Sequence, residues 1–230
     1  MCIDYKQFAK NYVATARTQR EQNLVTFRTA KSEASRLSDQ LYGATEAAKD
    51  RKAVQELIDY KIPGFFPTPD ELAQRVISWA DIETSHKVLE PSAGAGHIAE
   101  AIPKDIDLTC VEQNHTLAQV LIKKGFKTVN TNFLAWQPDF KFDRIVMNPP
   151  FEKRQDIAHV QYAFNQLKVG GILVSIISAG AFYAASRKIE QDFQNWLGQY
   201  SVAQEILSDA FACALRPTNV KVALVKIVKK

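Results

Sequence analysis

Cysteine is scarce in this chain of 230 residues, and its three copies, Cys2, Cys110 and Cys213, are too widely spaced to form a C-x-x-C pair. This spacing argues against a disulfide framework or a cysteine-bound zinc site. The four histidines show no metal-ligand pattern either, so we expect no metal. No apolar run approaches the roughly 20 residues of a membrane-spanning helix, and the N-terminus lacks the pattern of a signal peptide. These absences predict a cytoplasmic protein without membrane contact.

Neither positive nor negative charge is in large excess in this chain. Lys and Arg together number 29 against 25 Asp and Glu, which gives a net charge of +4. Such a mildly basic balance is compatible with nucleic acid but does not by itself indicate it. Hydrophobic residues make up 46% of the chain, so a substantial core is possible and a globular protein is expected.

Glycine and proline are almost missing from residues 1–61, which contain only Gly43 and no proline. The segment is rich in helix-compatible residues, and its apolar positions are sparse. We predict an N-terminal helical extension over residues 1–61, broken near Gly43. Its basic residues are interspersed with acidic ones, so no clean DNA-binding stripe is present. Packing, dimerisation and target recognition all remain possible roles for it.

From residue 62 onward, strand-like and helix-like segments alternate, which is typical of an α/β fold with a mainly parallel sheet. The predicted strands are 87–90, 108–112, 126–129, 142–147, 172–177, 202–207 and 220–228. The predicted helices start after Thr68, near His97, after Asn114, and at residues 157 and 189. Thr68 and Glu71 form a capping-box pattern, and Asn114 is a candidate N-cap.

A glycine-rich turn, Glu90-Pro91-Ser92-Ala93-Gly94-Ala95-Gly96, follows the first predicted strand. Glycines let a backbone turn sharply and approach a ligand closely. Glu112 ends the second strand, where an acidic side chain can accept hydrogen bonds from both hydroxyls of a ribose. These features fit a nicotinamide dinucleotide and S-adenosylmethionine equally, and the turn is also compatible with no ligand at all.

Two later strand ends suit a flat nitrogenous ring. Asn132 and Phe133 follow the third strand and offer an acceptor beside an aromatic ring, which suits an adenine. Asn148-Pro149-Pro150-Phe151 ends the fourth strand, because consecutive prolines cannot donate to a ladder. The Asn148 side-chain oxygen and the Pro149 carbonyl can accept both hydrogens of an exocyclic amine. The Phe151 ring can stack on the base that carries it.

This second motif favours methylation of an amine over hydride transfer. An exocyclic amino nitrogen is conjugated with its ring and is a poor nucleophile. Two acceptors can draw its hydrogens toward a tetrahedral arrangement, so that the lone pair points at a methyl sulfonium. No strong general base is needed, because the proton can leave after transfer. We predict that Asn148, Pro149, Pro150 and Phe151 form the catalytic motif.

Together these motifs resemble the class I S-adenosylmethionine-dependent methyltransferases, and specifically the γ group of N6-adenine DNA methyltransferases. Phe65-Phe66-Pro67-Thr68-Pro69 is similar to that family's segment upstream of the cofactor loop. The stretch from Asn148 to Ile177 is also similar to methyltransferases of phages and mobile elements. The resemblance covers residues 62–230. It implies a Rossmann-like, mostly parallel sheet of seven strands with helices on both faces, and S-adenosyl-L-methionine as the cofactor.

The resemblance also implies a set of cofactor-binding residues. These are Thr68, Glu90, Ser92, Ala93, Gly94, Gly96, Glu112, Gln113, Asn132 and Phe133. Thr68 would lie near the methionine carboxylate, the glycine-rich turn along the methionine and ribose, and Glu112 at the ribose hydroxyls. Gln113 would lie along the adenine, which Asn132 and Phe133 would hold. The family usually has Asp in place of Asn132, so we expect weaker cofactor binding at most.

The chain departs from DNA-modifying members of that family in one respect. Those members generally carry a separate target-recognition domain, whereas residues 198–230 are expected to hold only the last two strands and their loop. The sequence still favours methyl transfer to N6 of an adenine flipped out of DNA. RNA adenine, a protein glutamine amide and a catalytically silent cofactor-binding or nucleic-acid-binding module remain open alternatives. A homodimer or a specificity partner bound through the N-terminal helices is also open.

Overall fold

The computed structural model describes Ile62 and residues 65–183, 187–208, 210–211 and 221–230. The predicted helical extension over residues 1–61 lies outside these residues, so its helices and any dimer contact through them remain predictions. Among the described helices, none has the length and apolar character to cross a membrane.

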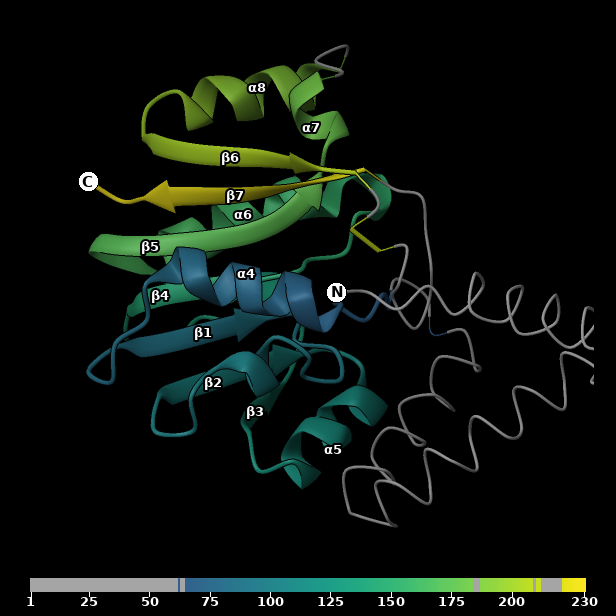
Figure 1. Ribbon diagram of the computed structural model, residues 1–230, viewed down its shortest axis with the longest axis vertical. Coiled ribbons are helices and arrows are strands. Elements are labelled where there is room, and N and C mark those ends of the chain that lie inside the picture. The colour runs from purple at the N-terminus through teal and green to yellow at the C-terminus, as the bar shows by residue number, and fades with distance from the viewer. Residues whose placement is uncertain (1–61, 63–64, 184–186, 209, 212–220) are drawn as a thin grey trace, which may run out of the picture. The chain divides into compact units, whose positions relative to one another are not determined.

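Within the described residues, seven strands form one sheet in the order β3-β2-β1-β4-β5-β7-β6 (Figure 1). The strands are β1 (Lys87–Pro91), β2 (Asp107–Glu112), β3 (Lys127–Asn130), β4 (Phe142–Met147), β5 (Leu167–Ser178), β6 (Ser201–Leu207) and β7 (Val222–Val228). Strands β1 to β5 pair in parallel, whereas β7 runs antiparallel to both β5 and β6. The predicted mostly parallel, seven-stranded sheet is confirmed.

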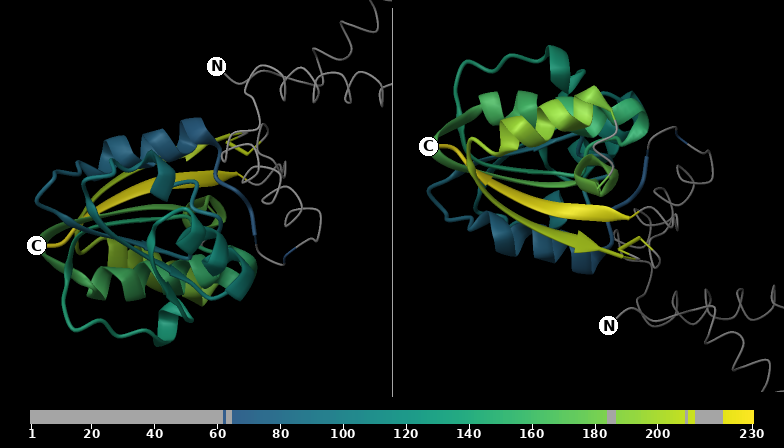
Figure 2. Two further views of the ribbon diagram at one scale, coloured as in Figure 1. Left: turned by 90° about the horizontal axis from the view of Figure 1, so that it is seen from below. Right: turned by 90° about the horizontal axis from the view of Figure 1, so that it is seen from above.

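Helices cover both faces of this sheet, as predicted. They are α4 (Asp70–Ala80), α5 (His115–Lys123), α6 (Gln155–Asn165), α7 (Gly180–Tyr183) and α8 (Lys188–Leu197), with 3₁₀ turns η1 (Ala99–Ala101), η2 (Phe133–Ala135) and η3 (Glu152–Arg154). Figure 2 shows α4, in blue, on one face, and α6 and α8, in green, on the opposite face.

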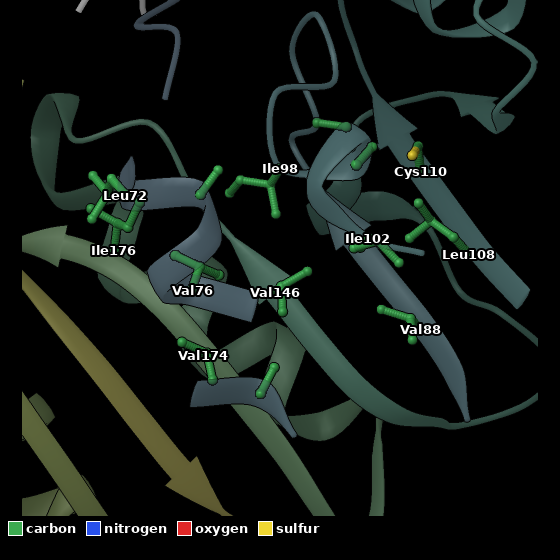
Figure 3. Packing of buried hydrophobic residues seen from close by; sticks show 14 of the residues in the cluster. Leu72, Val76, Val88, Ile98, Ile102, Leu108, Cys110, Val146, Val174 and Ile176 are labelled. Atoms are coloured by element: carbon green, nitrogen blue, oxygen red, sulfur yellow. The ribbon is translucent and has the colours of Figure 1, made fainter. Parts of the chain in front are cut away.

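Alternation along the buried strands assigns each side chain to one of two cores. Val88 and Val146 lie in the core on the face of the sheet that α4 covers, in the same cluster as Val76 (Figure 3). Their neighbours in the chain, Leu89 and Ile145, point to the other face and pack in the core beneath α6 and α8. The central strands are therefore buried on both faces, which explains why their sequences read as continuous apolar runs.

The helix predicted from about His97 is wrong, because the structure has only the 3₁₀ turn η1 there. Ile102 precedes Pro103 and adopts an extended conformation with ψ 136°. A residue before proline is disfavoured in the helical region, since the proline ring crowds its backbone and Cβ.

The capping box predicted at Thr68 is also wrong. The N-cap of α4 is Pro69, and no side chain caps this helix end. The Thr68 hydroxyl instead accepts a hydrogen bond from Asn148, 80 residues further along the chain. The Asn114 cap is confirmed, because its Oδ1 accepts from the Leu117 N–H at 3.1 Å.

Strand β5 begins earlier than predicted, at Leu167 rather than at residue 172. Gly170 and Gly171 lie inside the strand. The pairing between β4 and β5 shifts register between Phe142 and Arg144, which accommodates the irregular start.

Candidate active site

A cavity of about 430 Å³ lies where the carboxyl ends of β1, β2 and β4 meet the segment before α4. The sheet order reverses direction between β1 and β4, and ligands of open parallel sheets bind at such a switch point. All predicted catalytic and cofactor-binding residues line this cavity except Gly96. The fold thus brings together motifs that are spread from Thr68 to Phe151 in the sequence.

The glycine-rich turn is held in a left-handed conformation at two of its lining residues. Ser92 has φ 57° and Gly94 has φ 58°. A Cβ atom on Gly94 would lie 3.0 Å from the Phe65 ring, so a side chain there would meet both strain and crowding. The Gly94 N–H donates to Glu112 Oε2 at 2.8 Å, which ties the turn to the end of β2.

Gly96 was predicted to bind the cofactor, but it does not line the cavity. It has φ 89°, and a Cβ atom would lie 2.8 Å from Leu121 Cδ2 on α5. This glycine is required for backbone conformation and for close packing against α5. Lys124, just after α5, also holds the turn, with Nζ 2.9 Å from both the Ala95 carbonyl oxygen and Glu100 Oε1.

Glu112 is a buried acceptor at the end of β2. Its Oε2 accepts from Gly94, and its Oε1 accepts from the Asn114 N–H at 2.7 Å. Burial raises the pKa of Glu112, and the backbone N–H donors oppose that rise. An ionised carboxylate offers about four lone-pair sites, so acceptor capacity remains for ligand hydroxyls after these two bonds.

Glu90 lies deeper, near the end of β1, and is almost fully buried. Its Oε2 has no hydrogen-bond partner among the described residues. Burial raises its pKa well above the usual range, and the Glu112 charge adds to this rise. A buried carboxyl oxygen without a donor suits a cationic ligand group. In the described part of the chain, no cluster of three His, Cys, Asp or Glu side chains could hold a metal ion.

Asn148 presents a defined amide orientation. Its Nδ2 donates to Thr68 Oγ1 at 3.0 Å and to the Phe66 carbonyl at 3.4 Å. A carbonyl can only accept, so the NH₂ group must face Phe66 and the amide oxygen must point elsewhere. That oxygen, Oδ1, is buried and has no partner among the described residues. Asn148 therefore holds a free acceptor at the cavity.

Asn132 and Phe133 border the cavity, but each also has a structural role. Asn132 Oδ1 accepts from the Leu134 N–H at 3.0 Å and caps η2, which leaves it one further acceptor site. Phe133 as a whole residue is only 3% exposed, and its ring packs edge-on against Tyr162, with centroids 5.1 Å apart. Only a small part of this ring is accessible to an adenine.

Four polar lining residues were not singled out from the sequence: His97, Thr131, Gln155 and His159. Burial lowers the pKa of both histidines, so both are neutral near pH 7. His159 Nδ1 lies 2.8 Å from the Gln155 carbonyl, which can only accept, so Nδ1 carries the proton and Nε2 is an acceptor. The one sequence signal of His97, Gln155 and His159 is proximity to the glycine-rich turn and to the proline motif.

A family model described as the methyltransferase small domain matches residues 69–205. No match was found among curated proteins.

Three solved structures illustrate the shared fold. PH1948 of Pyrococcus horikoshii, named as a candidate RNA methyltransferase, is 21% identical over 71% of this chain and 87% of its own, with a TM-score of 0.55. The M protein of the type I restriction enzyme EcoKI is 13% identical over 73% of this chain and 44% of its own, with a TM-score of 0.59. The O-methyltransferase TomG from Streptomyces achromogenes, solved with S-adenosylmethionine, is 14% identical over 81% and 91%, with a TM-score of 0.57. At such low identities the similarity establishes the fold alone.

Proposed function

Because the chain belongs to the methyltransferase small domain family, we propose that it transfers a methyl group from S-adenosylmethionine to an exocyclic amine, N6 of adenine in DNA. S-adenosylmethionine is the cofactor of this methyltransferase. The observation that carries the choice of an amine is the buried Asn148 Oδ1 at the cavity, which has no hydrogen-bond partner among the described residues. A hydrogen on the target nitrogen would satisfy it.

The cavity residues fit this cofactor. When bound, S-adenosylmethionine supplies an electrophilic methyl group on a sulfonium sulfur. Glu112 has acceptor sites left for ribose hydroxyls. The unpartnered Oε2 of Glu90 suits the ammonium group of the methionine portion, because a buried carboxyl oxygen without a donor is costly. Gly94 has no Cβ atom, so the backbone of the glycine-rich turn can approach a ligand closely there.

The catalytic motif would orient the amine and stabilise its developing charge. Asn148 Oδ1 and the Pro149 carbonyl would each accept one amino hydrogen, so that the nitrogen lone pair points at the methyl carbon. As the nitrogen gains positive charge, both hydrogen bonds strengthen, which is stabilisation specific to the transition state. Phe151, half-buried at the cavity, would stack on the base. After methyl transfer, the nitrogen would release its extra proton to solvent.

DNA adenine is proposed as the target for two reasons. The order of motifs, from Phe65-Phe66-Pro67-Thr68-Pro69 to Asn148-Pro149-Pro150-Phe151, is similar to the γ group of adenine DNA methyltransferases. The M protein of a type I restriction enzyme also shares the fold. RNA is the second candidate, because PH1948, named as a candidate RNA methyltransferase, has the highest identity of the three structures compared.

Incubation of the full chain with tritiated S-adenosylmethionine and DNA, RNA or protein would test the proposal. We expect label in DNA, recovered as N6-methyladenine after digestion. Label in RNA alone would show that the substrate is RNA and not DNA, and the proposed methylation of an amine would stand. Label in a hydroxyl or carbon position would overturn the role of Asn148. Cofactor binding without transfer to any polymer would identify a silent binding module.

Replacing Thr68 with valine is expected to lower kcat at saturating cofactor roughly 5- to 30-fold, because Asn148 loses one of two acceptors that orient its amide. Thr68→Ser keeps the hydroxyl and should retain most of the activity. Steady-state kinetics with both variants would check this. An unchanged kcat in Thr68→Val would show that the Phe66 carbonyl alone orients the amide.

A further inference from the structure

The chain makes a strained turn directly after the catalytic motif. Lys153 has φ 52° and Arg154 has φ 62°, so two successive non-glycine residues adopt the left-handed conformation. Such backbone is costly for residues with a Cβ atom and persists only when surrounding contacts hold it in place. The Arg154 N–H donates to the Phe151 carbonyl at 3.3 Å, so the turn is continuous with the segment that carries the Phe151 ring.

The Arg154 side chain supplies contacts of this kind. It does not line the cavity and reaches the end of β5, where Nη1 donates to Ser178 Oγ at 3.0 Å. Its Nη2 lies 2.6 Å from Glu190 Oε1 on α8. This contact is an ion pair rather than an aligned hydrogen bond, since Oε1 has no aligned donor among the described residues. A Cβ atom on Gly180 would lie 2.8 Å from Nη2, so the guanidinium occupies space that only glycine leaves open.

The partners of Arg154 are themselves fixed. Glu190 is 1% exposed, and its Oε2 accepts from the Arg187 N–H at 3.3 Å, at the start of α8. Asp156, fully buried in the first turn of α6, accepts from the Ser178 N–H at 2.9 Å through Oδ2. The ends of β5, α6 and α8 therefore meet around one half-buried guanidinium, and the buried charge of Glu190 is tolerated only with such pairing.

We propose that Arg154, through its contacts with Glu190 and Ser178, is a positioning residue that holds the Asn148–Phe151 segment in its productive place. Arg154 does not line the cavity, so its effect on the reaction passes through the strained turn and the Phe151 carbonyl. The kinetic part of this inference rests on the proposed amine methylation, whereas the structural part does not.

Three variants of the full chain test this role. Arg154→Met removes the ion pair with Glu190 and the Ser178 contact. It should lower kcat roughly 100-fold, because a small displacement of the reacting groups slows a reaction by about this factor. Arg154→Lys keeps the charge and should recover part of this loss. Arg75→Met is the matched control, because Arg75 pairs with Glu205 on β6 and does not line the cavity, and it should leave kcat unchanged. Affinity for S-adenosylhomocysteine, measured by calorimetry, should stay within about twofold in all three.

Amide hydrogen exchange gives a readout that does not depend on turnover. Peptides spanning residues 148–156 should exchange about tenfold faster in Arg154→Met than in the unaltered protein, and no faster in Arg75→Met. If Arg154→Met does not fold, the same measurements on Ser178→Ala would test the proposal. This variant removes one contact of Arg154 and leaves its ion pair with Glu190 in place. Unchanged exchange in this segment would overturn the proposal. So would a parallel loss of kcat and cofactor affinity. If the unaltered protein methylates no polymer, the proposed function is wrong. The hydrogen-exchange result would still decide whether Arg154 positions the Asn148–Phe151 segment.

Discussion

Replacing Asn148 with alanine is expected to lower the rate of methyl transfer by about 100- to 1000-fold. Losses of this size follow when one preorganised group that stabilises developing charge is removed from an active site. The physical reason is the free Oδ1 acceptor, whose orientation depends on Thr68 and Phe66. Cofactor affinity should remain nearly unchanged. Single-turnover transfer of tritiated methyl groups and calorimetry with S-adenosylhomocysteine would measure the two quantities separately.

Two further variants sharpen this result. Asn148→Asp keeps acceptor oxygens but cannot donate to the Phe66 carbonyl, so its activity should fall between those of the unaltered protein and the alanine variant. Asn165→Ala is the control, because this exposed asparagine at the end of α6 does not line the cavity. Transfer that survives in Asn148→Ala would mean that the orientation mechanism is wrong.

Replacing Glu112 with glutamine is expected to weaken cofactor binding by about 1.5 to 3 kcal/mol, or roughly 10- to 150-fold in Kd. The carboxylate accepts from the Gly94 and Asn114 N–H groups and, on our proposal, from ribose hydroxyls. A glutamine NH₂ group would turn one acceptor into a donor that faces a backbone N–H. The glycine-rich turn would also lose one of its anchors, so the melting temperature should fall.

Calorimetric titration of S-adenosylhomocysteine into Glu112→Gln would check the affinity, with Glu83→Gln as the control. Glu83 is exposed and lies outside the cavity lining, so the control should bind as the unaltered protein does. An unchanged Kd in Glu112→Gln would remove Glu112 from the cofactor site and leave it a purely structural role in holding Gly94.

Local signals predicted most of the secondary structure correctly. Strand β4 was predicted with its observed bounds, because an apolar run is stopped by two prolines that cannot join a ladder. The failures arose where a local signal met a competing constraint. A helix was predicted from about His97, after the glycine-rich turn, but Pro103 prevents it. Thr68 has the spacing of a capping box, yet its hydroxyl is used by Asn148.

The sequence by itself determined the α/β fold and which motifs end the strands, because periodicity, glycine and proline act on the backbone within a few residues. Only the tertiary structure decided how these motifs work together, because the contacts join residues far apart in the chain. It fixes the amide orientation of Asn148 through Thr68 and Phe66. It also shows that Gly96 serves packing rather than the cavity, and that Arg154 reaches Glu190. Side-chain orientation and burial depend on packing, which no local pattern encodes.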